Sequence, residues 1–204
     1  MKKHTSPKSP ARADRAGGVP ANYREALYWR ITESSWKLTL VNLLALPAAG
    51  LMGLLFFGWV VLVNHMPTGR SVPLVQAFSL ILAVAVTLGL HELAHALAMR
   101  AYGARPRFGV LWQGAMLYAT APGFAFRRNA YVVVILAPLV GLSLLALMAI
   151  LFLPPEAAVL VAVCATVNAA GAVGDLWILR ITLRYPEHAY VVDERDGMRI
   201  FLPA

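Results

Sequence analysis

Four apolar stretches, each long enough to cross a lipid bilayer, constrain the fold of this chain more than any other feature. They cover about residues 38–63, 73–99, 131–153 and 157–179. A spanning helix needs about 20 predominantly apolar residues, and the bilayer core offers no water to satisfy exposed backbone groups. We therefore expect an all-α integral membrane protein with four transmembrane helices.

Composition agrees with a membrane protein and argues against binding to nucleic acid. Hydrophobic residues make up 59% of the chain, charged residues 14%, and the mean hydropathy is +0.65. The net charge is +8, but the basic residues fall between the apolar stretches and form no single binding stripe. With four spans, all 18 Lys and Arg residues except Arg70 lie on one side of the bilayer. The positive-inside rule assigns that side, with both termini, to the cytoplasm of a multi-pass protein of the cell membrane.

The segments before and after this membrane domain, which we place at 38–184, are expected to be simple. Residues 1–21 are basic and rich in Ser, Pro and Gly without a following apolar core, which predicts a disordered cytoplasmic tail and not a signal peptide. Residues 22–37 place apolar side chains four residues apart, which predicts an interfacial helix. Residues 185–204 are expected to form a short cytoplasmic tail, with a small hairpin at its turn residues Arg195-Asp196-Gly197.

Between the second and third spans lies an apolar segment that we do not expect to cross the bilayer. Arginines stand at both of its ends, and Gly and Pro interrupt it. Apolar residues alternate over 108–112 and again over 116–120, with Gln113-Gly114 between them, which predicts a β-hairpin. Non-helical backbone at membrane depth is tolerated where it is buried or lines a wet cavity. We therefore expect a re-entrant hairpin beside a cavity.

The end of the second span carries the string His91-Glu92-Leu93-Ala94-His95. On a helix, residues four apart lie on one face, so both histidines can turn a ring nitrogen toward one metal ion. Glu92 lies about 100° further around the helix, where it can act as a general base without being a ligand. The alternative is a chance grouping of buried residues. Insertion of an ionisable side chain in a spanning helix costs roughly 2.5–3.5 kcal/mol of free energy, however, which favours a functional site over a chance grouping.

A hydrolytic zinc site takes three protein ligands and keeps one position for water, so a third ligand is needed. Besides Glu92, Asp175 is the only acidic residue within a predicted span. It lies five residues before Arg180, just as His95 lies five residues before Arg100, so both sit at one depth. Pairing of Asp175 with Arg180 is the alternative. Asn168 lies on the same helix face as Asp175. Two roles are open for it, that of a catalytic residue and that of a hydrogen-bonding group between helices.

These motifs resemble those of the site-2 intramembrane metalloproteases. The His-Glu-x-x-His string, the hairpin with basic flanks, and the stretch from Asn168 to Gly174-Asp175-Leu176 carry the likeness, which is greatest to the zincin peptidases among small bacterial membrane proteins. The chain departs from the site-2 pattern in lacking the prolines between the asparagine and the aspartate. The resemblance implies zinc ligands at His91, His95 and Asp175, a general base at Glu92, and a substrate-positioning or oxyanion-stabilising residue at Asn168.

The expected function is that of a membrane-embedded zinc endopeptidase. It would hydrolyse peptide bonds of membrane or membrane-proximal protein substrates near the cytoplasmic face. The alternative is a metal-binding membrane protein without proteolysis, such as an ion-handling or chaperone-like protein. Glu92 favours the enzyme, because a pure metal site needs no non-ligand carboxylate beside its first histidine.

Overall fold

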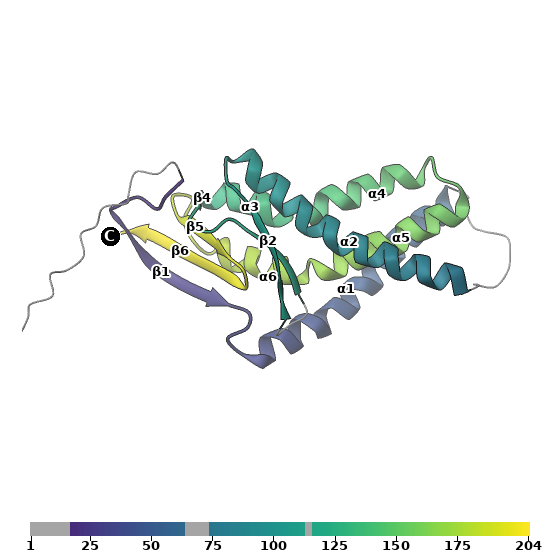
Figure 1. The fold of residues 1–204 in the computed structure, drawn as a ribbon, viewed down its shortest axis with the longest axis horizontal. Coiled ribbons are helices and arrows are strands. Elements are labelled where there is room, and N and C mark those ends of the chain that lie inside the picture. Colours follow the sequence, from purple (N-terminus) through teal and green to yellow (C-terminus); the bar gives the residue numbers. More distant parts are fainter. Residues whose placement is uncertain (1–16, 64–73, 113–115) are drawn as a thin grey trace, which may run out of the picture.

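The computed structural model describes residues 17–63, 74–112 and 116–204. Helices extend away from a small sheet that occupies one end of the molecule (Figure 1). In chain order the elements are β1 (Tyr23–Arg30), α1 (Ser35–Leu62), α2 (Leu74–Ala101), β2 (Arg107–Leu111), β3 (Met116–Thr120), β4 (Ala125–Arg127), α3 (Arg128–Ala137), the π-helical turn η2 (Pro138–Leu142), α4 (Ser143–Ile150), α5 (Pro155–Gly171), α6 (Val173–Thr182), β5 (Tyr190–Glu194) and β6 (Gly197–Pro203).

The four apolar stretches are helical, as the sequence predicts. Four helical segments among the described residues are long and apolar enough to cross a membrane: Ser35–Leu62, Phe78–Ala101, Arg128–Ile150 and Pro155–Thr182. The third consists of α3, η2 and α4, and the fourth of α5 and α6. The chain therefore has the make-up of a membrane protein.

The outer faces of these helices are apolar and their inner faces carry small residues. Leu54 is 77% exposed, as is expected of a side chain that faces lipid. Toward the bundle, α5 places Ala158, Ala162 and Ala165 on one face, and they pack against Phe56 and Val60 of α1. Small residues let helix backbones approach closely, which is how packing rather than water exclusion holds membrane helices together.

A four-stranded antiparallel sheet with the order β1-β6-β5-β4 closes one end of the molecule. β1 pairs with β6 from Tyr23↔Pro203 to Arg30↔Gly197, although the two strands stand at opposite ends of the chain. A Cβ atom at Gly197 would collide with the carbonyl oxygen of Trp29, so this position requires glycine.

The prediction of an all-α fold is therefore wrong, since the described residues form six strands in two antiparallel sheets. The predicted interfacial helix over 22–37 is a strand followed by the start of α1. Its spacing of apolar residues fits both structures, and the pairing with β6 decides between them. The predicted tail over 185–204 forms β5 and β6, and so contributes two strands of the sheet. The hairpin predicted there is confirmed.

The hairpin predicted between the second and third spans is also confirmed. β2 and β3 pair in register from Arg107↔Thr120 to Leu111↔Met116 and form a separate two-stranded sheet. The predicted turn at Gln113-Gly114 lies outside the described residues, as do residues 1–16 of the predicted basic tail. Whether the hairpin enters the membrane stays a prediction.

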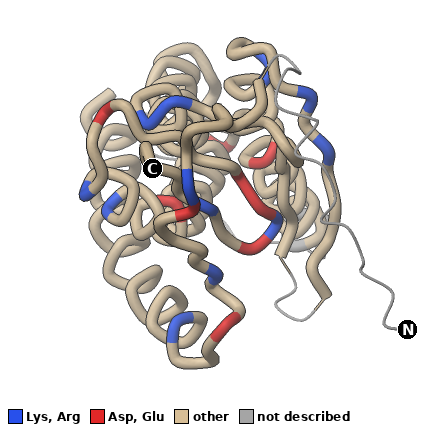
Figure 2. Tube along the Cα trace, turned by 90° about the vertical axis from the view of Figure 1, so that its left-hand side faces the viewer, with Lys and Arg blue, Asp and Glu red and all other residues tan. Residues whose placement is uncertain are grey.

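A buried cluster joins the sheet to the helix ends. It includes Met99 of α2, Phe126 of β4, Tyr131 of α3, and Met198 and Ile200 of β6. Figure 2 views the molecule from this end and shows Lys, Arg, Asp and Glu residues spread over it. Because the cluster holds β5 and β6 against α2 and α3, the β5–β6 turn lies close to the His-Glu-x-x-His string.

Candidate metal centre

The two histidines of the string lie on one face of α2, one helical turn apart. Both are buried, with 8% and 9% of the surface of His91 and His95 exposed. Their ring centroids lie 5.1 Å apart, with the ring planes 76° from parallel. The i, i+4 spacing therefore brings both imidazoles to one point, as the sequence predicts.

A backbone carbonyl fixes the ring of His95. Nδ1 of His95 lies 2.8 Å from the carbonyl oxygen of Val134. A carbonyl only accepts, so Nδ1 carries the proton and Nε2 keeps its lone pair. The residue four positions after Val134 is Pro138, which has no N–H to close the usual helical bond. Pro138, the first residue of the π-helical turn η2, thus leaves the Val134 carbonyl free to accept from His95.

Asn168 fixes the ring of His91 in the same way. Its Nδ2 donates to the carbonyl oxygen of Pro138 at 3.1 Å, so its Oδ1 faces His91. The Oδ1 oxygen lies 3.0 Å from Nδ1 of His91 and accepts the proton of that nitrogen. Only 1% of Asn168 is exposed. Asn168 therefore forms the interhelical hydrogen bond that was one of its two predicted roles, and it also contacts a histidine of the site.

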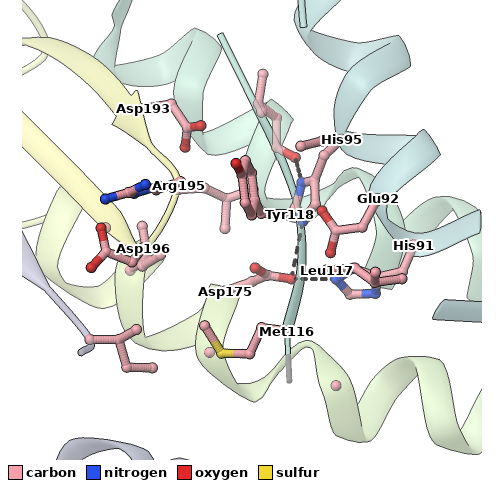
Figure 3. Close-up of a pocket in the computed structure, with 18 of the residues that line it drawn as sticks. His91, Glu92, His95, Met116, Leu117, Tyr118, Asp175, Asp193, Arg195 and Asp196 are labelled. Atoms are coloured by element: carbon pink, nitrogen blue, oxygen red, sulfur yellow. Dashed lines mark hydrogen bonds and ion pairs between the residues drawn. The ribbon is translucent and has the colours of Figure 1, made fainter. Parts of the chain in front are cut away.

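Asp175 completes the group from the first turn of α6. Its Oδ2 lies 3.0 Å from Nε2 of His91 and 3.4 Å from Nε2 of His95. Figure 3 shows dashed lines from its carboxylate to both rings. Its contact with both histidines replaces the alternative pairing with Arg180.

The three side chains fit a zinc ion. Their candidate ligand atoms all lie within 4.8 Å of one another. Tetrahedral zinc with bonds of about 2.0–2.1 Å separates its ligand atoms by about 3.3 Å. The distances from the Asp175 oxygen to the two histidine nitrogens are close to that value. Both free nitrogens are Nε2 with Nδ1 held by an acceptor, which is the usual arrangement of metal-binding histidines.

Glu92 borders the same cavity without joining this group. It contacts the backbone of Ala119 in β3, and the cluster of candidate ligands does not contain it. Its carboxylate nevertheless lies beside the histidines in Figure 3. This is the position predicted for a general base, next to the ligands but on another part of the helix surface.

The cavity around the site has a volume of about 340 Å³. All five predicted site residues line it, and so does strand β3 of the hairpin that was expected beside a cavity. Sequence analysis did not connect the β5–β6 turn with the site, but this turn also lines the cavity. It carries Asp193, whose carboxylate accepts a hydrogen bond from Tyr131 at 2.7 Å. Burial raises the pKa of Asp193 to about 7, although the bond from Tyr131 opposes this.

Comparison with known proteins identifies one family. A family model described as "Putative zincin peptidase" matches residues 84–190, which is more than half of the chain and contains all five predicted site residues. No curated protein matches the chain. No solved structure matches it either.

Proposed function

Because the chain belongs to the zincin peptidase family, we propose that it is a membrane-embedded zinc endopeptidase of the site-2 type. Its substrates are membrane or membrane-proximal proteins, cleaved near the cytoplasmic face. The observation that carries the proposal is the convergence of Nε2 of His91, Nε2 of His95 and Oδ2 of Asp175 beside a carboxylate that is not part of the group.

The three converging side chains would hold the ion. A zinc ion held there would supply Lewis-acid chemistry, which polarises a scissile carbonyl and brings the pKa of a bound water to about 7. Asn168 and the Val134 carbonyl keep both imidazoles turned with Nε2 toward the centre. Such outer contacts usually matter because they fix ring orientation and ligand basicity.

Glu92 acts as the proton carrier. Its carboxylate takes a proton from the attacking water and delivers it to the amine that leaves when the peptide bond breaks. The backbone of Ala119 in β3 lies beside that carboxylate. The same carboxylate therefore serves as base and then as acid.

Strand β3 provides a surface for an extended substrate. β2 pairs with one edge of β3, and the cavity lies beside Met116, Leu117, Tyr118 and Ala119. A helical substrate hides its carbonyls in its own hydrogen bonds, whereas a peptide added to a strand edge presents them in a regular row. The hairpin carries Trp112 with 85% of its surface exposed, which supports contact with the bilayer.

The charge distribution supports a cytoplasmic orientation of the sheet. Every described Lys and Arg lies in the four-stranded sheet, at the start of β2, in the connecting segments at that end, or at the adjoining helix ends. By the positive-inside rule this end faces the cytoplasm, which puts both termini there. The partners are then the lipid bilayer and membrane protein substrates, without nucleic acid.

Substitution of Glu92 by Gln tests the proposal. The amide has nearly the same shape and removes no ligand, so the purified variant should keep its zinc and fold. Hydrolysis should fall by roughly 10²–10⁴-fold, the usual contribution of general acid–base catalysis. Uncleaved substrate should accumulate on the variant and be captured with it.

The matched control is Glu187→Gln, an exposed carboxylate outside the cavity. It should hydrolyse substrate at the wild-type rate. A Glu92→Gln protein that keeps zinc and the full wild-type cellular phenotype would overturn the proposal in favour of a metal-binding protein without proteolysis.

A further inference from the structure

The turn of the β5–β6 hairpin carries three acidic side chains, and two of them have cationic partners. Oε1 of Glu194 lies 3.0 Å from Nε of Arg199, and Oδ2 of Asp196 lies 3.0 Å from Nε of Arg30. No such ion pair involves Asp193 among the residues that the structure describes. Its Oδ2 atom is buried and has no hydrogen-bond partner in the described part of the chain. A buried carboxylate oxygen without a donor is costly and needs a physical explanation.

The rest of Asp193 is held in place. Its Oδ1 accepts the hydroxyl proton of Tyr131, which is itself only 1% exposed. Its backbone carbonyl accepts the hydroxyl of Thr120 in β3 at 3.1 Å, and its backbone pairs with Met198 in β6. The free oxygen therefore keeps one position, as a preorganised acceptor does.

That position borders the candidate metal centre. Asp193 lines the same cavity as His91, His95 and Asp175, and Figure 3 shows its carboxylate on the side of the cavity across from α2. Arg195 also lines the cavity, but no ion pair joins it to Asp193 among the described residues. The Thr120 hydroxyl lies near this carboxylate and lowers its pKa, but its hydrogen bond goes to the backbone carbonyl of Asp193. Among the described residues, Oδ2 thus remains an acceptor beside the centre without a hydrogen bond of its own.

We propose that the free carboxylate oxygen of Asp193 binds an N–H donor of the peptide substrate, and that Tyr131 is the positioning residue for this carboxylate. The inference rests on the proposed peptidase function. A carboxylate accepts hydrogen bonds, and N–H groups, above all cationic ones, are its strongest partners. The donor is either a backbone amide on the far edge of a peptide added to β3 or a Lys or Arg side chain of the substrate.

Peptide binding to the zinc-loaded Glu92→Gln protein in lipid nanodiscs tests this inference without turnover. The probes are two fluorescent membrane-spanning peptides with a Pro-Gly-broken centre, identical except for Lys or norleucine at the central position. The Glu92→Gln protein is the parent. Dissociation constants are measured by fluorescence anisotropy for the parent and for versions of it that also carry Asp193→Asn, Asp193→Ala or Tyr131→Phe. Glu187→Gln is the control, and zinc content is measured in each variant.

Both Asp193 variants should bind roughly 10–100-fold more weakly, the usual effect of losing a hydrogen bond to a charged group. A loss of affinity for the Lys peptide alone identifies a basic side chain as the donor. An equal loss of affinity for both peptides identifies the backbone amide. Tyr131→Phe should weaken binding in the same pattern but less, with zinc content unchanged. Unaltered binding by both Asp193 variants would overturn this inference and leave the peptidase intact. Failure of the parent and the control to bind either peptide would overturn the proposed function, and this inference with it.

Discussion

Removal of the Asn168 side chain should weaken zinc binding although this residue is not among the proposed ligands. In the structure Asn168 Oδ1 accepts the Nδ1 proton of His91, and its Nδ2 donates to the Pro138 carbonyl. Asn168→Ala removes the first bond, worth about 0.5–1.5 kcal/mol net. It also lets the ring take two orientations, which costs about 0.4 kcal/mol, so the total corresponds to roughly 5–25-fold in zinc affinity.

The assay is competition for zinc between a chelator of known affinity and the purified protein in detergent. Stability should also fall, by about 1–3 kcal/mol, because the Pro138 carbonyl remains buried without its donor. Thr166→Ala in the same helix is the matched control, since its hydroxyl donates to the Ala162 carbonyl of its own helix, α5. Wild-type zinc affinity in Asn168→Ala would refute the view that this side chain orients His91.

Two further predictions concern Pro138 and Asp193. Pro138→Ala restores a helical N–H that competes with His95 for the Val134 carbonyl. Zinc affinity should therefore fall about ten-fold, while the thermal stability of the metal-free protein rises. An unchanged zinc affinity in the chelator competition would contradict this prediction. Burial raises the pKa of Asp193 from 3.8 to about 7, so between these values the folded state keeps a proton that the unfolded chain has lost. The unfolding free energy of the metal-free wild type should therefore decline as pH rises through this window, by up to about 1.4 kcal/mol per unit, and denaturant titrations of Asp193→Asn should lack this part of the decline. Parallel curves for the two proteins would contradict the raised pKa.

Local sequence was enough to predict the grouping at the centre of the site. The i, i+4 spacing of His91 and His95 places two side chains on one face of any helix, whatever surrounds that helix. Asp175 could be found because its helix was expected to cross the same bilayer as α2, and a fixed rise per residue converts distance from a flanking arginine into depth. The four apolar stretches were readable for a similar reason, since a bilayer permits few structures within it.

Tertiary structure alone decided which other groups reach this centre. Residues 22–37 have a pattern that suits a helix or a strand, and the pairing of β1 with β6, from the other end of the chain, makes β1 a strand. The same pairing sets the β5–β6 turn against the cavity and so brings Asp193 to it. Pro138 indicates locally that the Val134 carbonyl lacks its helical hydrogen bond. It does not indicate that His95 is the residue that donates to this carbonyl. Which donor meets a freed carbonyl, and which acid lacks a cation, depends on packing between segments distant in sequence, and no local periodicity encodes that.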